Sequence, residues 1–173
     1  MTSEERRIEE EALAHAKKHR NKIARRLTDP GVFVPEANPV SVFMAGSPGA
    51  GKTEASIELI NLKSADGAKV LRIDPDELRE EFPGYTGENA WLFQRAVTPI
   101  VERIHDLALE QEQSFLLDGT LSSYKVAEKN IQRSLKRGRT VQILYVYQEP
   151  QQAWKIVQAR EAAERRRIQP EDF

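Results

Sequence analysis

A short glycine-rich segment of the sequence has the residue types of a phosphate-binding loop. It fits the pattern G-x-x-x-x-G-K-[ST] and consists of Gly46-Ser47-Pro48-Gly49-Ala50-Gly51-Lys52-Thr53, hereafter the glycine loop. Its glycines allow a tight turn in which successive backbone N–H groups converge on one anion. Lys52 would place positive charge at the β- and γ-phosphates, and the Thr53 hydroxyl would bind Mg²⁺. The segment therefore predicts binding of ATP or GTP together with Mg²⁺.

The residues on either side of the glycine loop support this prediction. An apolar run, residues 40–45, precedes the loop, and a helix-compatible segment, residues 54–62, follows it. A strand, a glycine loop and a helix in this order point the N-terminus of the helix at bound phosphate. The alternative is an ordinary glycine-rich turn with a solvated Lys52, which the strand and helix around the loop disfavour.

Two acidic residues follow a second apolar segment. Residues 69–73 are predicted to form a strand that ends in Asp74-Pro75-Asp76. Ligands of open α/β sheets bind at the carboxyl ends of the strands, so both acids should face the glycine loop. Asp74 could reach the water shell of a metal ion, or it could cap a helix that starts at Pro75. Asp76 could accept a proton from an acceptor hydroxyl.

A third predicted strand, residues 115–117, ends in Asp118-Gly119-Thr120. An aspartate at this place can act as a Walker-B-type acid, and Gly119 would allow a ligand to approach closely. A plain strand-to-helix turn is the competing interpretation. If the first interpretation holds, this segment lies at the same edge of the sheet as the glycine loop.

Arginines are concentrated near the end of the sequence. Arg160 lies within a predicted helix that starts near Pro150, and Arg165-Arg166-Arg167 follows it. Phosphoryl transfer spreads negative charge over the oxygens of the transferred group, and arginines stabilise that charge. A solvated basic face is the alternative for Arg160, and we expect one member of the triple to act on the nucleotide.

The composition excludes several classes of function. The 173 residues include no cysteine, so disulfides, thiolate metal sites and a cysteine nucleophile are ruled out. The 26 basic and 27 acidic residues are balanced, which gives no support for nucleic-acid binding. The sequence has no leader-like apolar segment at its start and no apolar run of membrane-spanning length. We therefore expect a cytoplasmic protein with no membrane contact.

The remaining segments predict the elements that position these residues. Residues 4–28 should form a helix capped by Thr2 or Ser3, and residues 88–112 should form a helix that bends or breaks near 96–98 because of Pro99. A further helix should run from 122 or 123 to about 136, and residues 141–147 should form a buried parallel strand.

The predicted fold class is α/β. It is a P-loop NTPase or kinase-like three-layer αβα arrangement with a mostly parallel central sheet and an N-terminal helical extension. Residues 1–29 would form the extension and residues 38–173 the core. The extension would either lie on the core or serve as an arm that binds a partner.

The combination of these motifs resembles the zeta-toxin family, the PezT-like P-loop kinases of bacterial toxin–antitoxin systems. The resemblance runs from about residue 42 to the end of the chain. Five features carry it: the glycine loop, Ile73-Asp74-Pro75-Asp76-Glu77-Leu78-Arg79, Val97-Thr98-Pro99, Asp118-Gly119-Thr120, and the spacing of Arg160 and Arg167.

The resemblance implies a kinase that phosphorylates the 3′-hydroxyl of UDP-N-acetylglucosamine with ATP or GTP and Mg²⁺, and so stops cell-wall synthesis and growth. It implies that Lys52 and Thr53 bind nucleotide and metal. Asp76 matches the catalytic base of the family. Arg160 and Arg167 match the two arginines that clamp the nucleotide.

The resemblance also implies an acceptor site. Asp118 and Thr120 match a substrate-binding pair, although the family usually has Glu in place of Asp118 and often Arg in place of Ser122. Family members usually continue beyond the position of Phe173 with another helix, so we expect a trimmed core or a sheet that lacks one covering element.

Other functions stay open on the residues alone. The acceptor could be another hydroxyl, on a nucleoside, a nucleic-acid end or an antibiotic. The protein could also bind nucleotide without phosphoryl transfer and use its first helix for a partner. As a kinase of this family it would be inhibited by an antitoxin protein, or in cis by its own N-terminal helix.

Overall fold

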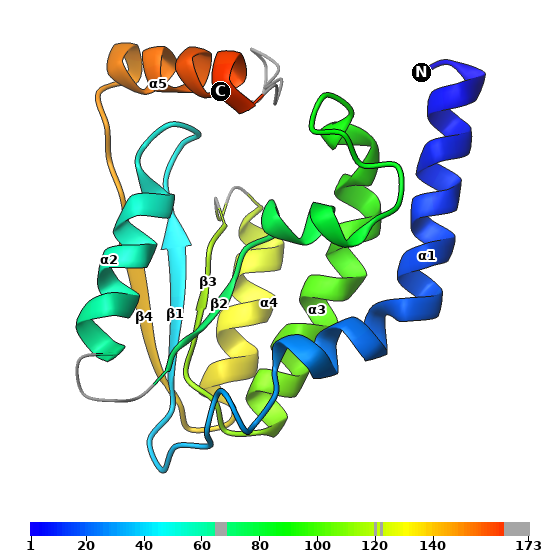
Figure 1. Ribbon diagram of the computed structural model, residues 1–173. Coiled ribbons are helices and arrows are strands. Elements are labelled where there is room, and N and C mark those ends of the chain that lie inside the picture. The colour runs from blue at the N-terminus through cyan, green and yellow to red at the C-terminus, as the bar shows by residue number, and fades with distance from the viewer. Residues whose placement is uncertain (65–68, 120, 122, 165–173) are drawn as a thin grey trace.

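The centre of the protein is a parallel sheet of four strands (Figure 1). The structure is a computed structural model and describes residues 1–64, 69–119, 121 and 123–164, with backbone alone at 64 and 160–164. The strands are β1 (Val40–Ala45), β2 (Leu71–Ile73), β3 (Phe115–Leu117) and β4 (Thr140–Tyr145). Their order is β2-β3-β1-β4, and each neighbouring pair is parallel. The predicted α/β class is confirmed.

Helices cover both faces of the sheet. Helix α2 (Lys52–Ser64) lies on one face, and α3 (Gln94–Glu110) and α4 (Tyr124–Leu135) lie on the other (Figure 1). Helix α1 (Ser3–Leu27) packs outside α3, and α5 (Pro150–Glu164) crosses above the carboxyl ends of the strands (Figure 1). None of the helices in the described part of the chain has the length and apolar character needed to cross a bilayer.

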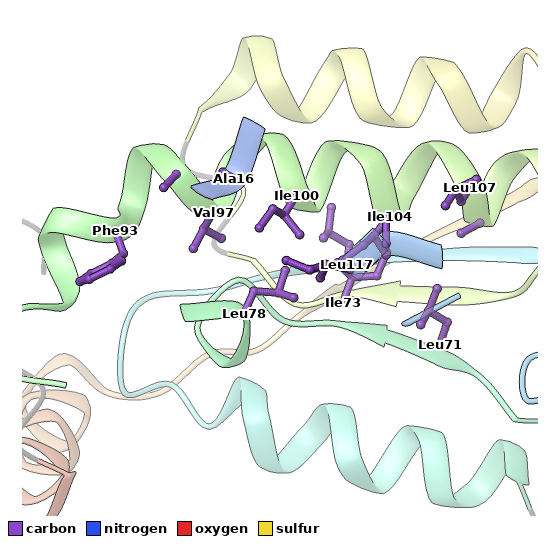
Figure 2. Close-up of a cluster of buried hydrophobic side chains, with 14 of the residues drawn as sticks. Ala16, Leu71, Ile73, Leu78, Phe93, Val97, Ile100, Ile104, Leu107 and Leu117 are labelled. Atoms are coloured by element: carbon purple, nitrogen blue, oxygen red, sulfur yellow. The ribbon is translucent and has the colours of Figure 1, made fainter. Parts of the chain in front are cut away.

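The two faces of the sheet bury separate apolar clusters. Because side chains alternate along a strand, Phe43 of β1 points to the α3 face while its neighbours Val42 and Met44 point to α2. The α3 cluster is the larger. Figure 2 shows its residues from α3, β2, β3 and the segment after β2, among them Ile73, Leu78, Val97, Ile100, Ile104 and Leu117. This packing fixes β2 and β3, whose carboxyl ends carry the acids.

Helix α1 belongs to the core. Thr2 and Glu5 form a capping box at its start, which confirms the predicted cap, with Glu5 N–H donating to the Thr2 hydroxyl at 3.1 Å. Its buried face consists largely of small residues that let α3 approach closely: Ala12, Ala16, Ile23 and Ala24. A buried glutamine, Gln113, donates from Nε2 to the carbonyl of Thr28 at 2.9 Å and so fixes the end of the helix to the start of β3.

The prediction for the segment of residues 88–112 is wrong in two respects. Ala90–Phe93 form a short 3₁₀ helix, η2, and α3 begins only at Gln94. The helix then continues through Pro99, so the break that was one of the two expected outcomes is absent, while the other, a bend, stays a prediction. Pro99 removes a single hydrogen bond, to the carbonyl of the exposed Arg95 near the N-terminus of α3. The helix tolerates this loss because its apolar face is buried along its whole length.

The prediction that residues 141–147 form a buried strand is also wrong. β4 pairs with β1 alone and lies at the edge of the sheet as described. Ile143 is 57% exposed and Tyr145 is 67% exposed. The register places Ile143 beside Phe43, on the face that α3 covers at β1 and β3 but not at β4. An apolar sequence cannot distinguish an edge strand from a central one, because exposure depends on which helices reach it.

Candidate functional site

The glycine loop joins the carboxyl end of β1 to the first residue of α2, Lys52. Its three glycines all have positive φ angles, 144° at Gly46, 72° at Gly49 and 91° at Gly51. Side-chain-bearing residues rarely adopt these conformations, so the loop shape requires glycine. At Gly46 the packing requires it as well, because an added Cβ would lie 2.3 Å from the carbonyl oxygen of Val146.

The side chain of Lys52 folds back over the loop. Its Nζ donates to the carbonyl oxygens of Gly46 and Ser47, at 2.8 Å in both cases. A cation held among oxygen acceptors at a helix N-terminus suits the phosphates of a nucleotide. Ser47, Pro48 and Ala50 complete the loop, and Ala50 is buried. The residues present therefore fit a nucleoside triphosphate.

Helix α5 closes one side of the glycine loop. An added Cβ at Gly49 would lie 2.3 Å from the carbonyl oxygen of Ala153 and 2.9 Å from Val157. The predicted nucleotide clamp, Arg160, lies farther along this helix, where only the backbone is described. Arg167 lies outside the described residues. The contact at Gly49 therefore supports the position of the helix but does not test the role of either arginine.

An arginine from β2 joins two of the predicted acids. Arg72 Nη2 donates to Asp74 Oδ2 at 2.6 Å and to Asp118 Oδ2 at 2.7 Å. Its Nη1 donates to Glu77 at 2.5 Å, and its Nε donates to the hydroxyl of Ser56 on α2 at 2.9 Å. The two acids, 44 positions apart in sequence, therefore meet at one guanidinium group.

Burial controls the electrostatics of this cluster. Burial raises the pKa of Asp74, and the charges of Asp118 and Asp76 add to the effect, although the positive charge of Arg72 opposes it. Burial acts to lower the pKa of Arg72, but the charges of Asp74, Glu77 and Asp118 outweigh burial and leave it raised. The cation is therefore firmly charged and stabilises the two buried carboxylates.

Asp74 also shapes the turn that presents Asp76. Asp74 Oδ1 accepts from the backbone N–H of Asp76 at 2.8 Å, as an aspartate does in an Asx turn. Both of its carboxylate oxygens are therefore engaged within the protein. The metal role predicted for Asp74 stays a prediction. The alternative, that Asp74 caps a helix starting at Pro75, is wrong, because the η1 segment (Glu77–Glu81) starts later and its N-cap residue is Asp76.

Asp76, the predicted base, has its own arginine. Arg79 Nη1 donates to Asp76 Oδ1 at 2.5 Å, and Arg79 Nη2 donates to Gln94 Oε1 at 2.7 Å. The Asp76 side chain is 53% exposed, whereas that of Arg79 is 13% exposed. The first residue of α3 therefore anchors an arginine that orients a carboxylate open to solvent.

The structure gives partial information on the other predicted residues. Asp118 lies beside Arg72 and Ser56, and Ser56 is in the helix that follows the glycine loop. Apart from its chain neighbours, no described atom would lie within 4 Å of an added Cβ at Gly119. Thr120 lies outside the described residues.

The predicted Mg²⁺ has no acidic cage among the described residues, which contain no group of three or more His, Cys, Asp or Glu side chains suited to a metal. A nucleotide-bound Mg²⁺ does not need one, since phosphate oxygens, water and one hydroxyl suffice. Thr53 in the first turn of α2 fits that role.

Sequence reasoning missed three contributors to the site: Arg72, Ser56 and Gln94. Arg72 left a signal, because a charged residue inside an otherwise apolar strand next to two acids needs a partner. Arg79 lay within a quoted motif but was assigned no role. Ser56 and Gln94 left no signal, since their contacts depend on how α2 and α3 pack.

Two comparisons with known proteins bear on the family and the fold. The family model for Zeta toxin matches residues 23–173, which is most of the chain. The chain therefore belongs to the zeta toxin family. No curated protein sequence matches it.

Solved structures share its fold. One, from work on the PezAT chromosomal toxin-antitoxin system of Streptococcus pneumoniae, is 22% identical, with a TM-score of 0.71 over 87% of this chain and 64% of that chain. The AvrRxo1-ORF1:AvrRxo1-ORF2 structure with sulphate ions is 18% identical, with a TM-score of 0.55 over 90% and 49%. The Pnkp1/Rnl/Hen1 complex is 16% identical, with a TM-score of 0.54 over 69% and 39%. This chain thus spans less than two thirds of each of these structures.

Proposed function

We propose that this protein is a kinase that transfers the γ-phosphate of ATP or GTP to a hydroxyl group of a small metabolite. The observation that carries the proposal is the position of Asp76. Asp76 and the glycine loop follow the carboxyl ends of two parallel strands of one sheet, where open α/β sheets bind ligands. Family membership supports the same class of reaction.

The roles of the residues follow from their contacts. A bound nucleotide supplies the phosphoryl group and, with Mg²⁺, the electrophilic phosphorus. Lys52 at the loop neutralises phosphate charge, and Thr53 is the hydroxyl ligand available to the metal. Asp76 accepts the proton of the acceptor hydroxyl, and Arg79 holds its carboxylate in one orientation. Arg160 and Arg167 are proposed to contact the nucleotide.

We propose UDP-N-acetylglucosamine, at its 3′-hydroxyl, as the first acceptor to test. Its support is the family. One observation favours a different hydroxyl acceptor. Asp118 pairs with Arg72 inside the protein. It is therefore less available to bind a substrate hydroxyl than a carboxylate that faces solvent.

The test is incubation of the purified full chain with ATP or GTP, Mg²⁺ and separate panels of sugar nucleotides, nucleosides and RNA. Phosphorylated products are identified by mass spectrometry. Lys52→Ala and Asp76→Asn should each reduce product formation by about 100-fold or more. Asp106→Asn makes the same chemical change at a carboxylate that pairs with Arg133 away from the loop, and it should keep wild-type activity.

The result distinguishes the alternatives. A product with one acceptor class names the substrate. Nucleotide binding without a phosphorylated product in any panel would contradict the proposal and favour a nucleotide-binding module. Growth arrest on expression, if it persists in both Lys52→Ala and Asp76→Asn, would show that toxicity does not come from phosphoryl transfer.

We also propose that a protein antitoxin inhibits this chain in trans. The support is the naming of a toxin–antitoxin system for one structure that shares the fold. Inhibition in cis by α1 finds little support, because α1 packs along α3 and its small-residue face is buried there. Deletion of residues 1–28 should therefore yield an unstable or insoluble protein. A soluble deletion variant with raised toxicity would restore the hypothesis of inhibition in cis.

A further inference from the structure

Arg72 lies where four parts of the candidate site meet. It belongs to β2, and it contacts α2 through Ser56, the turn after β2 through Asp74, the η1 segment through Glu77 and the end of β3 through Asp118. Its side chain is 13% exposed, and those of Asp74 and Asp118 are 11% and 7% exposed. The guanidinium group therefore sits inside the site, with all three of its nitrogens engaged.

The contact with Ser56 extends this network to the glycine loop. The Ser56 hydroxyl accepts from Arg72 Nε at 2.9 Å and donates to the carbonyl oxygen of Thr53 at 2.7 Å. Thr53 is the loop residue proposed to bind the metal. Two hydrogen bonds thus connect the residue that would hold the phosphoryl donor with Arg72.

The contact with Asp74 extends the network in the other direction. Asp74 uses one oxygen for Arg72 and the other for the backbone N–H of Asp76. The proposed base is therefore also two hydrogen bonds from Arg72. Its side chain receives a separate contact from Arg79, which orients the carboxylate but does not relate it to the glycine loop.

We propose that Arg72 is a positioning residue that fixes the distance between the glycine loop and the acceptor side of the crevice. The planar fork of arginine is needed because Nε must reach α2 and Nη1 must reach η1 while Nη2 reaches both the β2 turn and the end of β3. Arg72 touches neither nucleotide nor acceptor in this scheme. The proposal rests on the proposed kinase function, since it concerns alignment for phosphoryl transfer.

The test compares kcat and KM for Arg72→Gln, Arg72→Lys and wild-type protein, with thermal unfolding measured for each. In Arg72→Gln we expect kcat to fall about 100-fold, because a misplacement of about 1 Å between reacting groups costs that much. KM for ATP should change less than about threefold, because the glycine loop itself is intact. Arg72→Lys keeps the charge but lacks the fork, so it should recover thermal stability without recovering kcat.

Arg95→Gln is the matched control. Arg95 forms an ion pair with Glu9, but its side chain is 69% exposed and lies on the outer side of α3 with α1. This substitution removes one guanidinium from the protein and should leave both kinetic constants unchanged. A comparable loss of kcat in Arg95→Gln would show that the effect of Arg72 is not specific to the site.

Ser56→Ala keeps the proposal testable if Arg72→Gln does not fold. It removes the hydroxyl between Arg72 and Thr53 and leaves every charge paired, and it should lower kcat several-fold with KM for ATP unchanged. Full kcat in folded Arg72→Gln, in Arg72→Lys or in Ser56→Ala overturns the positioning role while the kinase function stands. A wild-type protein without kinase activity overturns the proposed function, and this proposal with it.

Discussion

Each end of the parallel sheet holds an arginine whose side chain is mostly shielded from solvent, 13% exposed for Arg72 and 1% for Arg139, and the two have different hydrogen-bond partners. At the carboxyl end, Arg72 bonds through all three nitrogens to side chains of four residues, three of which are acids. At the amino end, Arg139 donates to Ser41 and to the carbonyl of Gln113. Its Nη1 has no hydrogen-bond partner among the described residues and forms only a long ion pair, 3.8 Å, with the half-exposed Glu112.

The histidine at the amino end extends the contrast. His105 stacks edge-on against Phe43 and Phe115, its Nδ1 lies 3.1 Å from Arg133, and its Nε2 has no hydrogen-bond partner in the described chain. Burial, together with the nearby positive charges of Arg133, Arg139 and Lys129, lowers the pKa of His105 to about 3. A strongly shifted pKa often marks a functional site, but this one lies far along α3 from the glycine loop and serves packing.

The two ends differ less in how deeply their arginines are buried than in how many acids lie around each arginine. The carboxyl end pairs each buried charge with an opposite one, and its contacts join elements that must hold ligands. The amino end instead surrounds Arg139 with neutral oxygens and a single acid, Glu112, at 3.8 Å. Three experiments can break or sharpen this comparison.

The largest effect is expected from Asp74→Ala. It removes one of the three acids around Arg72, which keeps Asp118 and Glu77, and it also removes the acceptor of the Asp76 N–H, so the free energy of unfolding should fall by about 2–4 kcal/mol. Glu102→Ala breaks the pair with Lys129, whose side chains are 51% and 60% exposed, and should cost about 0–1 kcal/mol. Urea unfolding measures both. Equal losses of unfolding free energy in Asp74→Ala and Glu102→Ala would mean that the contacts of Asp74 stabilise the protein no more than a surface ion pair does.

A smaller effect is expected from Gly49→Ala compared with Gly84→Ala. Both glycines have positive φ, 72° and 83°, so both variants carry similar backbone strain. Only at Gly49 would the new Cβ meet another backbone, at 2.3 Å from Ala153, whereas at Gly84 no described atom lies within 4 Å. Gly49→Ala should therefore be less stable than Gly84→Ala by about 1–3 kcal/mol.

Thermal unfolding with and without ATP measures this second pair. Gly49→Ala should also lose the stabilisation that ATP gives, because α5 must move away from the glycine loop. Equal stability of the two variants would show that α5 does not rest on the loop in solution.

The third effect depends on pH and concerns the amino end. The unfolded chain protonates His105 below about pH 6.5, while the folded protein keeps it neutral down to about pH 3. The unfolded state therefore binds more protons in this window, and stability falls by about 1.4 kcal/mol for each pH unit below 6.5. In His105→Phe this part of the dependence should vanish.

Urea unfolding at pH 7 and pH 5 checks the histidine prediction. Identical slopes for wild type and His105→Phe would show that His105 titrates in the folded protein. The surroundings of His105 would then accept a protonated imidazole, contrary to what its burial indicates.

Much of the candidate site could be predicted because its parts are local. The glycine loop, the strand before it and the helix after it lie within some 25 consecutive residues, and glycine and lysine types alone dictate their conformation. Asp118 could be singled out because it directly follows an apolar run, and Asp76 because it lies three residues after the end of a short strand. The start of α3 was missed, since Ala90–Phe93 have the same apolar spacing as the helix they precede.

The sequence by itself determined the α/β class, the glycine loop and the order of the acids, because strand periodicity, glycine conformation and motif spacing act over a few residues. Tertiary structure alone decided that β4 is an exposed edge, that α1 is part of the core and that Arg72 joins Asp74 to Asp118. These features depend on which elements lie side by side, and contacts across 44 positions of sequence leave no local pattern.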